Sequence, residues 1–68
     1  MRKIIISEKI KDYRRTNDLT QEDFAALIGV SPQAVSKWER VVCYPDITFL
    51  PELAEILHCS VCDFFEDT

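Results

Sequence analysis

The sequence predicts an all-α domain of five short helices. Apolar residues recur at helical spacing, capping residues precede these segments, and strand-like alternation is confined to "KIII" near the start. A chain of 68 residues with one glycine, 47% hydrophobic and 29% charged residues has the composition of a single packed domain. We therefore expect one domain over residues 1–68, with an ordered helical core at about 7–65 and a frayed tail at 66–68.

The first helix is predicted over about residues 7–17. Ser7 is the expected N-cap, and Ile6 just before it can act as a hydrophobic staple. Ile10 and Tyr13 follow at helical spacing. We expect this face to point into the core.

The second helix is predicted to begin at Thr20 and to end at Gly29. Thr20 and Asp23 have the spacing of a capping box, and glycine is the usual residue where a helix ends in the left-handed conformation. The residues expected to be buried are Phe24, Leu27 and Ile28.

The third helix is predicted to start only two residues after Gly29. Ser31 is its expected cap, and Pro32 occupies the first helical position, where a missing N–H has no consequence. Val35 and Trp38 are expected to face inward. The connecting turn "GVS" is therefore very tight.

The fourth and fifth helices follow the connector "VVCYPDI". Thr48 is the expected cap of the fourth helix, which should carry an apolar face inward. Ser60 and Asp63 suggest a last capped turn or two. The apolar residues of these two segments are Leu50, Leu53, Ile56, Leu57, Val61, Phe64 and Phe65.

Charge is distributed unevenly along the chain. Residues 1–40 contain all eight Lys and Arg beside six acids, whereas residues 41–68 contain six acids and no Lys or Arg. The two parts carry +2 and −6, which sum to the net charge of −4. A weakly basic face can therefore coexist with an acidic remainder, so nucleic acid is not excluded, although non-specific affinity should be modest.

The second and third predicted helices, with their tight turn, form a helix-turn-helix pattern. Through "LTQEDFAALIGVSPQAVSKWER", "YPDITFLPELAEIL" and "CSVCDFF", the sequence resembles the XRE or phage Cro-repressor family of lambda-repressor-like DNA-binding domains. The resemblance spans about residues 10–65. It implies a compact five-helix fold in which the third helix enters the major groove and the second crosses the phosphate backbone.

The resemblance also implies that bases are read from the recognition helix at about residues 32–40. Gln33 and Lys37 lie four residues apart and so share one helical face. Glutamine can pair with adenine and lysine with guanine, each discriminating by roughly 1–3 kcal/mol. The competing interpretation is an ordinary solvated helix face. The expected base-contacting residues are Ser31, Pro32, Gln33, Ser36 and Lys37.

Phosphate contacts are expected from the start of the second helix and from isolated cations. Free N–H groups and the positive dipole end at Thr20 and Gln21 form an anion site, and the Gln21 amide adds a donor. Arg40 is the best single cationic contact, and Lys3 is a weaker one.

Glu39 is unexpected on a surface that meets DNA. The resemblance pairs it with Arg14 in a partly buried ion pair, which we interpret as structural. Relatives usually carry glycine after "WER", where this chain has Val41. Because a β-branched residue is disfavoured in the left-handed conformation, the third helix is expected to end differently and to leave Val41 and Val42 exposed.

Cys59 and Cys62 form a CxxC pattern that has to be weighed as a zinc or redox site. Zinc would also need His58 and Cys43, and adjacent His58 and Cys59 ligate one ion awkwardly. A redox motif would need a βαβ context. We interpret Cys59 as core filler and expect no metal, cofactor, small-molecule ligand or catalytic group.

Two functions fit these observations. The first is a sequence-specific double-stranded DNA-binding transcriptional regulator, a repressor, acting as a homodimer on a two-fold-related operator. The second is a protein-interaction module, antitoxin-like or regulatory, with weak DNA affinity. Apolar candidates for the dimer surface are "III", "VVCY" and the final "FF", with the C-terminal region preferred. Without a membrane-length apolar run, and with an odd number of cysteines, the chain is expected to be cytoplasmic.

Overall fold

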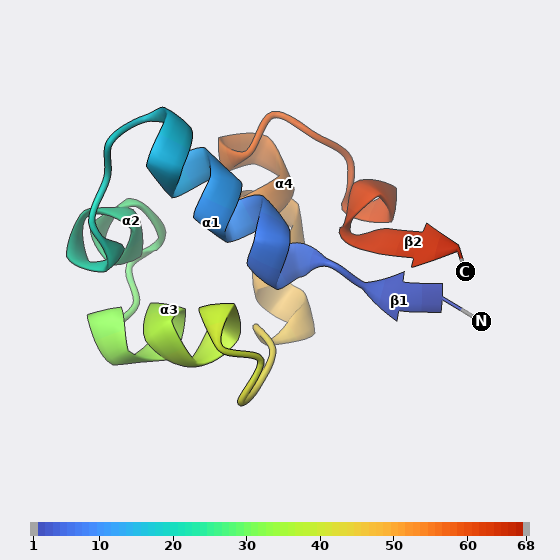
Figure 1. The fold of residues 1–68 in the computed structure, drawn as a ribbon, viewed down its shortest axis with the longest axis horizontal. Helices are drawn as coiled ribbons and strands as arrows, with labels where there is room; N and C mark the ends of the chain where they lie inside the picture. Colours follow the sequence, from blue (N-terminus) through green and yellow to red (C-terminus); the bar gives the residue numbers. More distant parts are fainter. Residues whose placement is uncertain (1, 68) are drawn as a thin grey trace.

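The computed structural model describes the backbone of residues 2–67 and the side chains of residues 4–66. Within these bounds the chain is mainly helical, and a short antiparallel ribbon brings its two ends together (Figure 1). The described residues form four α-helices, two 3-10 helices and two strands: β1 (Arg2–Ile4), α1 (Ile6–Thr16), α2 (Gln21–Ile28), α3 (Pro32–Glu39), η1 (Ile47–Phe49), α4 (Leu50–Ile56), η2 (Val61–Phe64) and β2 (Phe65–Asp67). None of the described helices is long and apolar enough to cross a bilayer.

The predicted fifth helix is only the 3-10 helix η2. The N–H of Ser60 does donate to the Asp63 carboxylate (3.0 Å), but the chain becomes extended at Phe65. There β2 pairs with β1, with Ile4 opposite Phe65. Because the β1 backbone supplies partners to residues 65–67, a further helical turn has no advantage. Glu66 and Asp67, which were expected in a frayed tail, thus belong to β2, while Thr68 lies outside the described residues.

The start of α1 is fixed by tertiary contact and not by a cap. Ser7 is a buried residue inside the helix, so its predicted role as N-cap is wrong. Ile5 occupies the cap position without a side-chain hydrogen bond, and its N–H donates to the carbonyl oxygen of Phe64 (2.8 Å). The bond ties the start of α1 to η2.

The entry to α4 also differs from the prediction. The Asp46 carboxylate accepts a hydrogen bond from the N–H of Thr48 (3.0 Å), so Asp46 and not Thr48 is the capping residue. It caps η1, which leads directly into α4. The chain therefore turns toward the core through a short 3-10 segment.

One apolar core joins all four α-helices and η2. Leu27 is not part of it: its side chain is 54% exposed, because its neighbours on α2 already cover the inner face of that helix. The buried apolar residues are Ile6, Ile10, Phe24, Ala25, Ile28, Val35, Trp38, Leu53, Ala54 and Phe64. The core holds α3 against α1 and α2, which fixes the outward face of α3.

Candidate nucleic-acid interface

The helix-turn-helix is formed by α2, the turn at residues 29–31 and α3. The Thr20 hydroxyl accepts from the N–H of Asp23 (3.0 Å), and the N–H of Thr20 donates to the Asp23 carboxylate (3.1 Å), which confirms the predicted capping box. Gly29 ends α2 in the left-handed conformation, with φ of 85°. The sharp turn follows because glycine adopts this conformation without steric strain.

The third helix begins as its sequence predicts. The Ser31 hydroxyl accepts from the N–H of Ala34 (3.2 Å), and Pro32 is the first helical residue. Val35 and Trp38 are 0% and 4% exposed and point into the core. The opposite side of α3 is therefore turned away from the protein.

The five residues predicted to contact bases lie at the start or on the outer side of α3. Four of them are exposed and Ser36 is half-buried. The Ser31 hydroxyl oxygen already caps α3, so its remaining hydrogen is the donor it can offer to a partner. The exposed residues are Ser31, Pro32, Gln33 and Lys37.

The end of α3 has the left-handed geometry that valine was expected to prevent. Val41 adopts φ of 59°, its N–H donates to the Trp38 carbonyl oxygen (3.2 Å), and the N–H of Val42 donates to that of Lys37 (2.9 Å). These two bonds form a Schellman motif. The prediction of a different helix end is thus wrong, and Val41 carries about 1–2 kcal/mol of backbone strain. Val41 and Val42 are exposed, as predicted.

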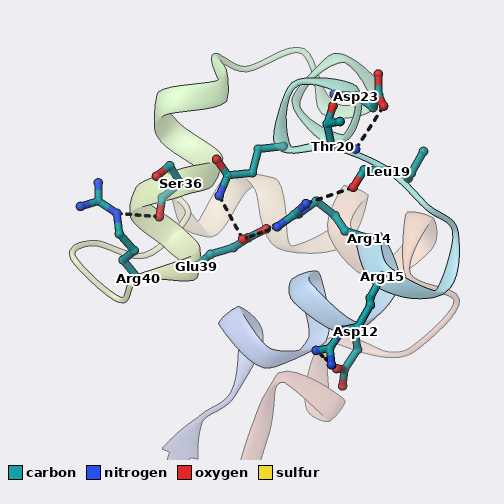
Figure 2. A network of polar contacts seen from close by, with 10 residues as sticks. Asp12, Arg14, Arg15, Leu19, Thr20, Asp23, Ser36, Glu39 and Arg40 are labelled. Carbon is teal, nitrogen blue, oxygen red and sulfur yellow. Dashed lines mark hydrogen bonds and ion pairs between the residues drawn. The ribbon is translucent and has the colours of Figure 1, made fainter.

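Arg40 lies at this helix end and remains available to an anion. Its side chain is exposed and extends along α3, where Nε donates to the Ser36 carbonyl oxygen at 3.4 Å (Figure 2). A bond of that length is weak, so the guanidinium is free to turn toward a phosphate. The side chain of Lys3, the other cation predicted to contact phosphate, lies outside the described part of the chain.

A partly buried ion pair joins α1 to α3. The Arg14 Nε and Nη2 atoms donate to Glu39 Oε2 (2.6 Å) and Oε1 (2.8 Å), and Nη1 donates to the Leu19 carbonyl oxygen (3.0 Å). Burial by itself raises the pKa of Glu39, but hydrogen bonds from Arg14 and Gln21, together with the Arg14 charge, hold that pKa below its ordinary value. The hydrogen bond to Glu39 raises the pKa of Arg14. Both groups are therefore charged at neutral pH.

The third partner of Glu39 is Gln21, the first residue of α2. Its Nε2 atom donates to Glu39 Oε1 (3.1 Å), so one carboxylate links α1, α2 and α3. This contact is not predicted by the sequence. Gln21 and Glu39 are 18 residues apart, and no local pattern signals a bond over that separation.

The start of α2 offers fewer donors than predicted. The N–H of Thr20 is engaged by Asp23, so it is not free for an anion. The N–H groups of Gln21 and Glu22, the first two helical residues, have no acceptor within the helix. The carboxylates of Glu22 and Asp23 lie in the same turn and oppose an incoming anion. An anion at this end of α2 would therefore be held mainly by directed donors.

Formal charge on the helix-turn-helix is low. Glu39 is neutralised by Arg14 of α1, which leaves the other four charges in balance. Attraction to a polyanion should therefore be weak at long range, and close polar contacts would supply most of the affinity. The charged residues of segment 20–40 are Lys37, Arg40, Glu22, Asp23 and Glu39.

Cys59 and Cys62 follow α4 and lie outside the helix-turn-helix segment. Cys59 is half-buried against the core and desolvation raises the pKa of its thiol, whereas Cys62 is exposed. A raised pKa lowers the fraction of reactive thiolate. The packing of Cys59 agrees with its interpretation as core filler.

Comparison with known proteins identifies the family. A family model described as helix-turn-helix matches residues 10–64, so the chain belongs to the helix-turn-helix family of DNA-binding regulators. The chain is also similar to the P22 c2 repressor protein, solved in complex with the synthetic operator 9T. The TM-score is 0.79 at 29% sequence identity, and the match covers 91% of this chain and 94% of that chain.

The chain is also similar to part of an antitoxin. Antitoxin PezA from Streptococcus pneumoniae serotype 4 is 42% identical over 36 residues, which are 53% of this chain and 23% of the antitoxin. The chain thus matches about a quarter of that relative's length.

Proposed function

We propose that the chain is a sequence-specific transcriptional repressor that binds double-stranded DNA as a homodimer in the cytoplasm, with α3 in the major groove. The observation that carries this function is the exposed polar side of α3, held outward by the buried Val35 and Trp38. The similarity to a repressor solved with its operator supports it.

Bases are read by the start and the outer side of α3. Gln33 and Lys37 are one helical turn apart and contact neighbouring base pairs, glutamine favouring adenine and lysine favouring guanine. Ser31 and Ser36 offer hydroxyl groups. Pro32 has no polar side-chain atom, so it offers only apolar contact, such as to a thymine methyl group.

Phosphates are bound at two places that flank α3. At the start of α2 the donors are the N–H groups of Gln21 and Glu22, the Gln21 amide and the Thr20 hydroxyl. Arg40 binds a phosphate at the other end of α3, and Lys3 adds a weaker contact. These contacts fix the register of α3 in the groove without reading sequence.

The homodimer follows from the size of the recognition surface, because one helix reads too few base pairs for useful specificity. An apolar groove of about 210 Å³ lies between the end of β1, the connector at 44–47 and the residues that begin β2. It unites parts of all three segments predicted as dimer surfaces. We assign this groove to the second copy. Its most exposed lining residues are Ile4, Tyr44 and Ile47.

Selection of bound duplexes from a random library tests this function. The unaltered chain should enrich a two-fold-related sequence with half-sites about one helical turn apart. Gln33→Ala and Lys37→Ala should each relax preference at particular positions, whereas Arg40→Ala should weaken all sequences alike. Unchanged binding in all three variants would exclude α3 as the reader.

A second candidate is a protein-interaction module with weak DNA affinity, favoured by the antitoxin match and by the acidic residues 41–68. Salt dependence separates the two functions. If the chain neutralises phosphates, the logarithm of its DNA affinity should fall as the logarithm of the salt concentration rises, with a slope of about −0.9 per phosphate contact. A module that binds only protein should show no salt-dependent binding to DNA.

A further inference from the structure

We infer that Glu39 is a positioning residue for DNA binding: its buried carboxylate holds the Gln21 amide in one orientation at the start of α2. As a result, α2 and α3 meet the DNA as one rigid unit. The inference rests on the proposed function and assigns Glu39 a role beyond its ion pair with Arg14.

The acceptor of the Gln21 amide is itself buried and held by hydrogen bonds. Glu39 is 6% exposed, and Arg14 holds both of its carboxylate oxygens through two hydrogen bonds. Arg14 is fixed in turn by the Leu19 carbonyl oxygen, at the loop that leads into α2. The Gln21 amide therefore binds to a carboxylate whose position is restricted by burial and by Arg14.

The remaining amide atoms of Gln21 are those that a phosphate can use. A primary amide has two N–H donors and one acceptor oxygen, and only one donor is needed for Glu39. Gln21 is half-buried, so its side chain also reaches solvent. Its second donor can bind a phosphate oxygen, beside the free N–H groups of Gln21 and Glu22.

Fixing the amide in advance raises DNA affinity. A free glutamine side chain loses rotamer freedom on binding, which weakens affinity by about 2- to 10-fold. A hydrogen bond to a charged carboxylate is stronger than one to a neutral group, so Glu39 restricts this freedom before DNA arrives. Arg14 neutralises Glu39, which limits repulsion of the nearby phosphate.

A double-mutant cycle on DNA affinity separates this role from a structural one. Gln21→Ala is made in the unaltered chain and in Arg14→Met/Glu39→Met, where apolar side chains replace the ion pair and commonly preserve stability. Each dissociation constant is measured on the duplex selected by the unaltered chain. Gln21→Ala should weaken binding about 10-fold in the unaltered chain and less than about 2-fold in the Met/Met chain.

Lys37→Ala provides the matched control. It removes another DNA contact on α3 that does not touch the ion pair, so its effect should be equal in both backgrounds. If Gln21→Ala also has equal effects in both, or has none in the unaltered chain, Glu39 has only a structural role. Failure of the unaltered chain to bind any duplex would contradict the proposed function itself.

Glu39→Gln gives a second background if the Met/Met chain does not fold. It retains the shape and one acceptor oxygen but removes the charge, so the effect of Gln21→Ala should fall below that in the unaltered chain. The NMR signals of the Gln21 side-chain amide provide an independent readout. They should shift on Glu39→Gln without DNA, and an unchanged amide signal would overturn the inference.

Discussion

The two helices of the helix-turn-helix end in the same backbone conformation but at very different residues. Gly29, at the end of α2, has φ of 85°, and Val41, at the end of α3, has φ of 59°. Glycine adopts this conformation freely, whereas a β-branched residue is strained there. The first end is therefore encoded locally, while the second is imposed by contacts elsewhere, among them the ion pair at Glu39 and the buried Trp38.

Loss of the hydrogen bonds at Glu39, two residues before Val41, should have the largest effect on stability. Glu39→Ala leaves Arg14 and Gln21 without their acceptor, so the free energy of unfolding should fall by about 3 kcal/mol. Denaturation in urea at pH 7, with Glu39→Gln as the milder variant, measures the loss. A change below about 0.5 kcal/mol would show that α3 is held by its apolar face alone.

The same pair gives stability a defined pH dependence. The pKa of Glu39 is lower in the folded chain than its ordinary value of 4.5. Its contribution is therefore fully present above about pH 4.5 and is lost as the pH falls through the folded pKa. Melting temperatures of the unaltered chain should drop more steeply below pH 4.5 than those of Glu39→Gln. Parallel curves would contradict the lowered pKa.

Substitution of Gly29, at the end of α2, should have the next largest effect on stability. Gly29→Val puts a β-branched residue at φ of 85°, where a Cβ atom would meet nothing within 4 Å. The Cβ atom therefore adds no clash, and backbone strain should lower the free energy of unfolding by about 2 kcal/mol. Gly29→Ala serves as the control with a smaller penalty. If both variants are as stable as the unaltered chain, glycine is not required to end α2.

The reverse exchange should stabilise the protein. Val41→Gly removes strain of about 1–2 kcal/mol and increases the freedom of the unfolded chain, for a net gain of about 1 kcal/mol. For a domain of this size the melting temperature should rise by about 4–8 °C. Asp18→Gly, at the left-handed end of α1, should change stability less, because aspartate tolerates this conformation. An equal gain in both variants would contradict a specific strain at Val41.

The smallest expected effect is the change in DNA affinity caused by Val41→Gly. The Schellman hydrogen bonds come from backbone groups, so glycine should leave Arg40 in place and change DNA affinity by less than about 3-fold. Dissociation constants measured on the selected duplex test this. A larger loss would mean that the Val41 side chain itself lies in the interface.

Much of the helix-turn-helix follows from short-range patterns in the sequence. The capping box of Thr20 and Asp23, the Ser31 cap and the turn at Gly29 were predicted because their hydrogen bonds join residues within a few positions of one another. The inward placement of Val35 and Trp38 followed from helical spacing alone. These features place the outer side of α3 at the surface, where the base-contacting residues remain a prediction.

Contacts over long sequence separations were decided by the tertiary structure. The sequence determined a helix-turn-helix in which one side of α3 is exposed. Caps, turns and helical periodicity act between residues within one or two helical turns, so they can be recognised in the sequence. Packing decided the β1–β2 ribbon, the bond from Ile5 to Phe64, the left-handed Val41 and the link from Gln21 to Glu39. The ribbon and the two hydrogen bonds depend on groups that only the folded core brings within hydrogen-bond distance. At Val41 the hydrogen bonds are local, and the packing of the helix end outweighs the local preference of valine.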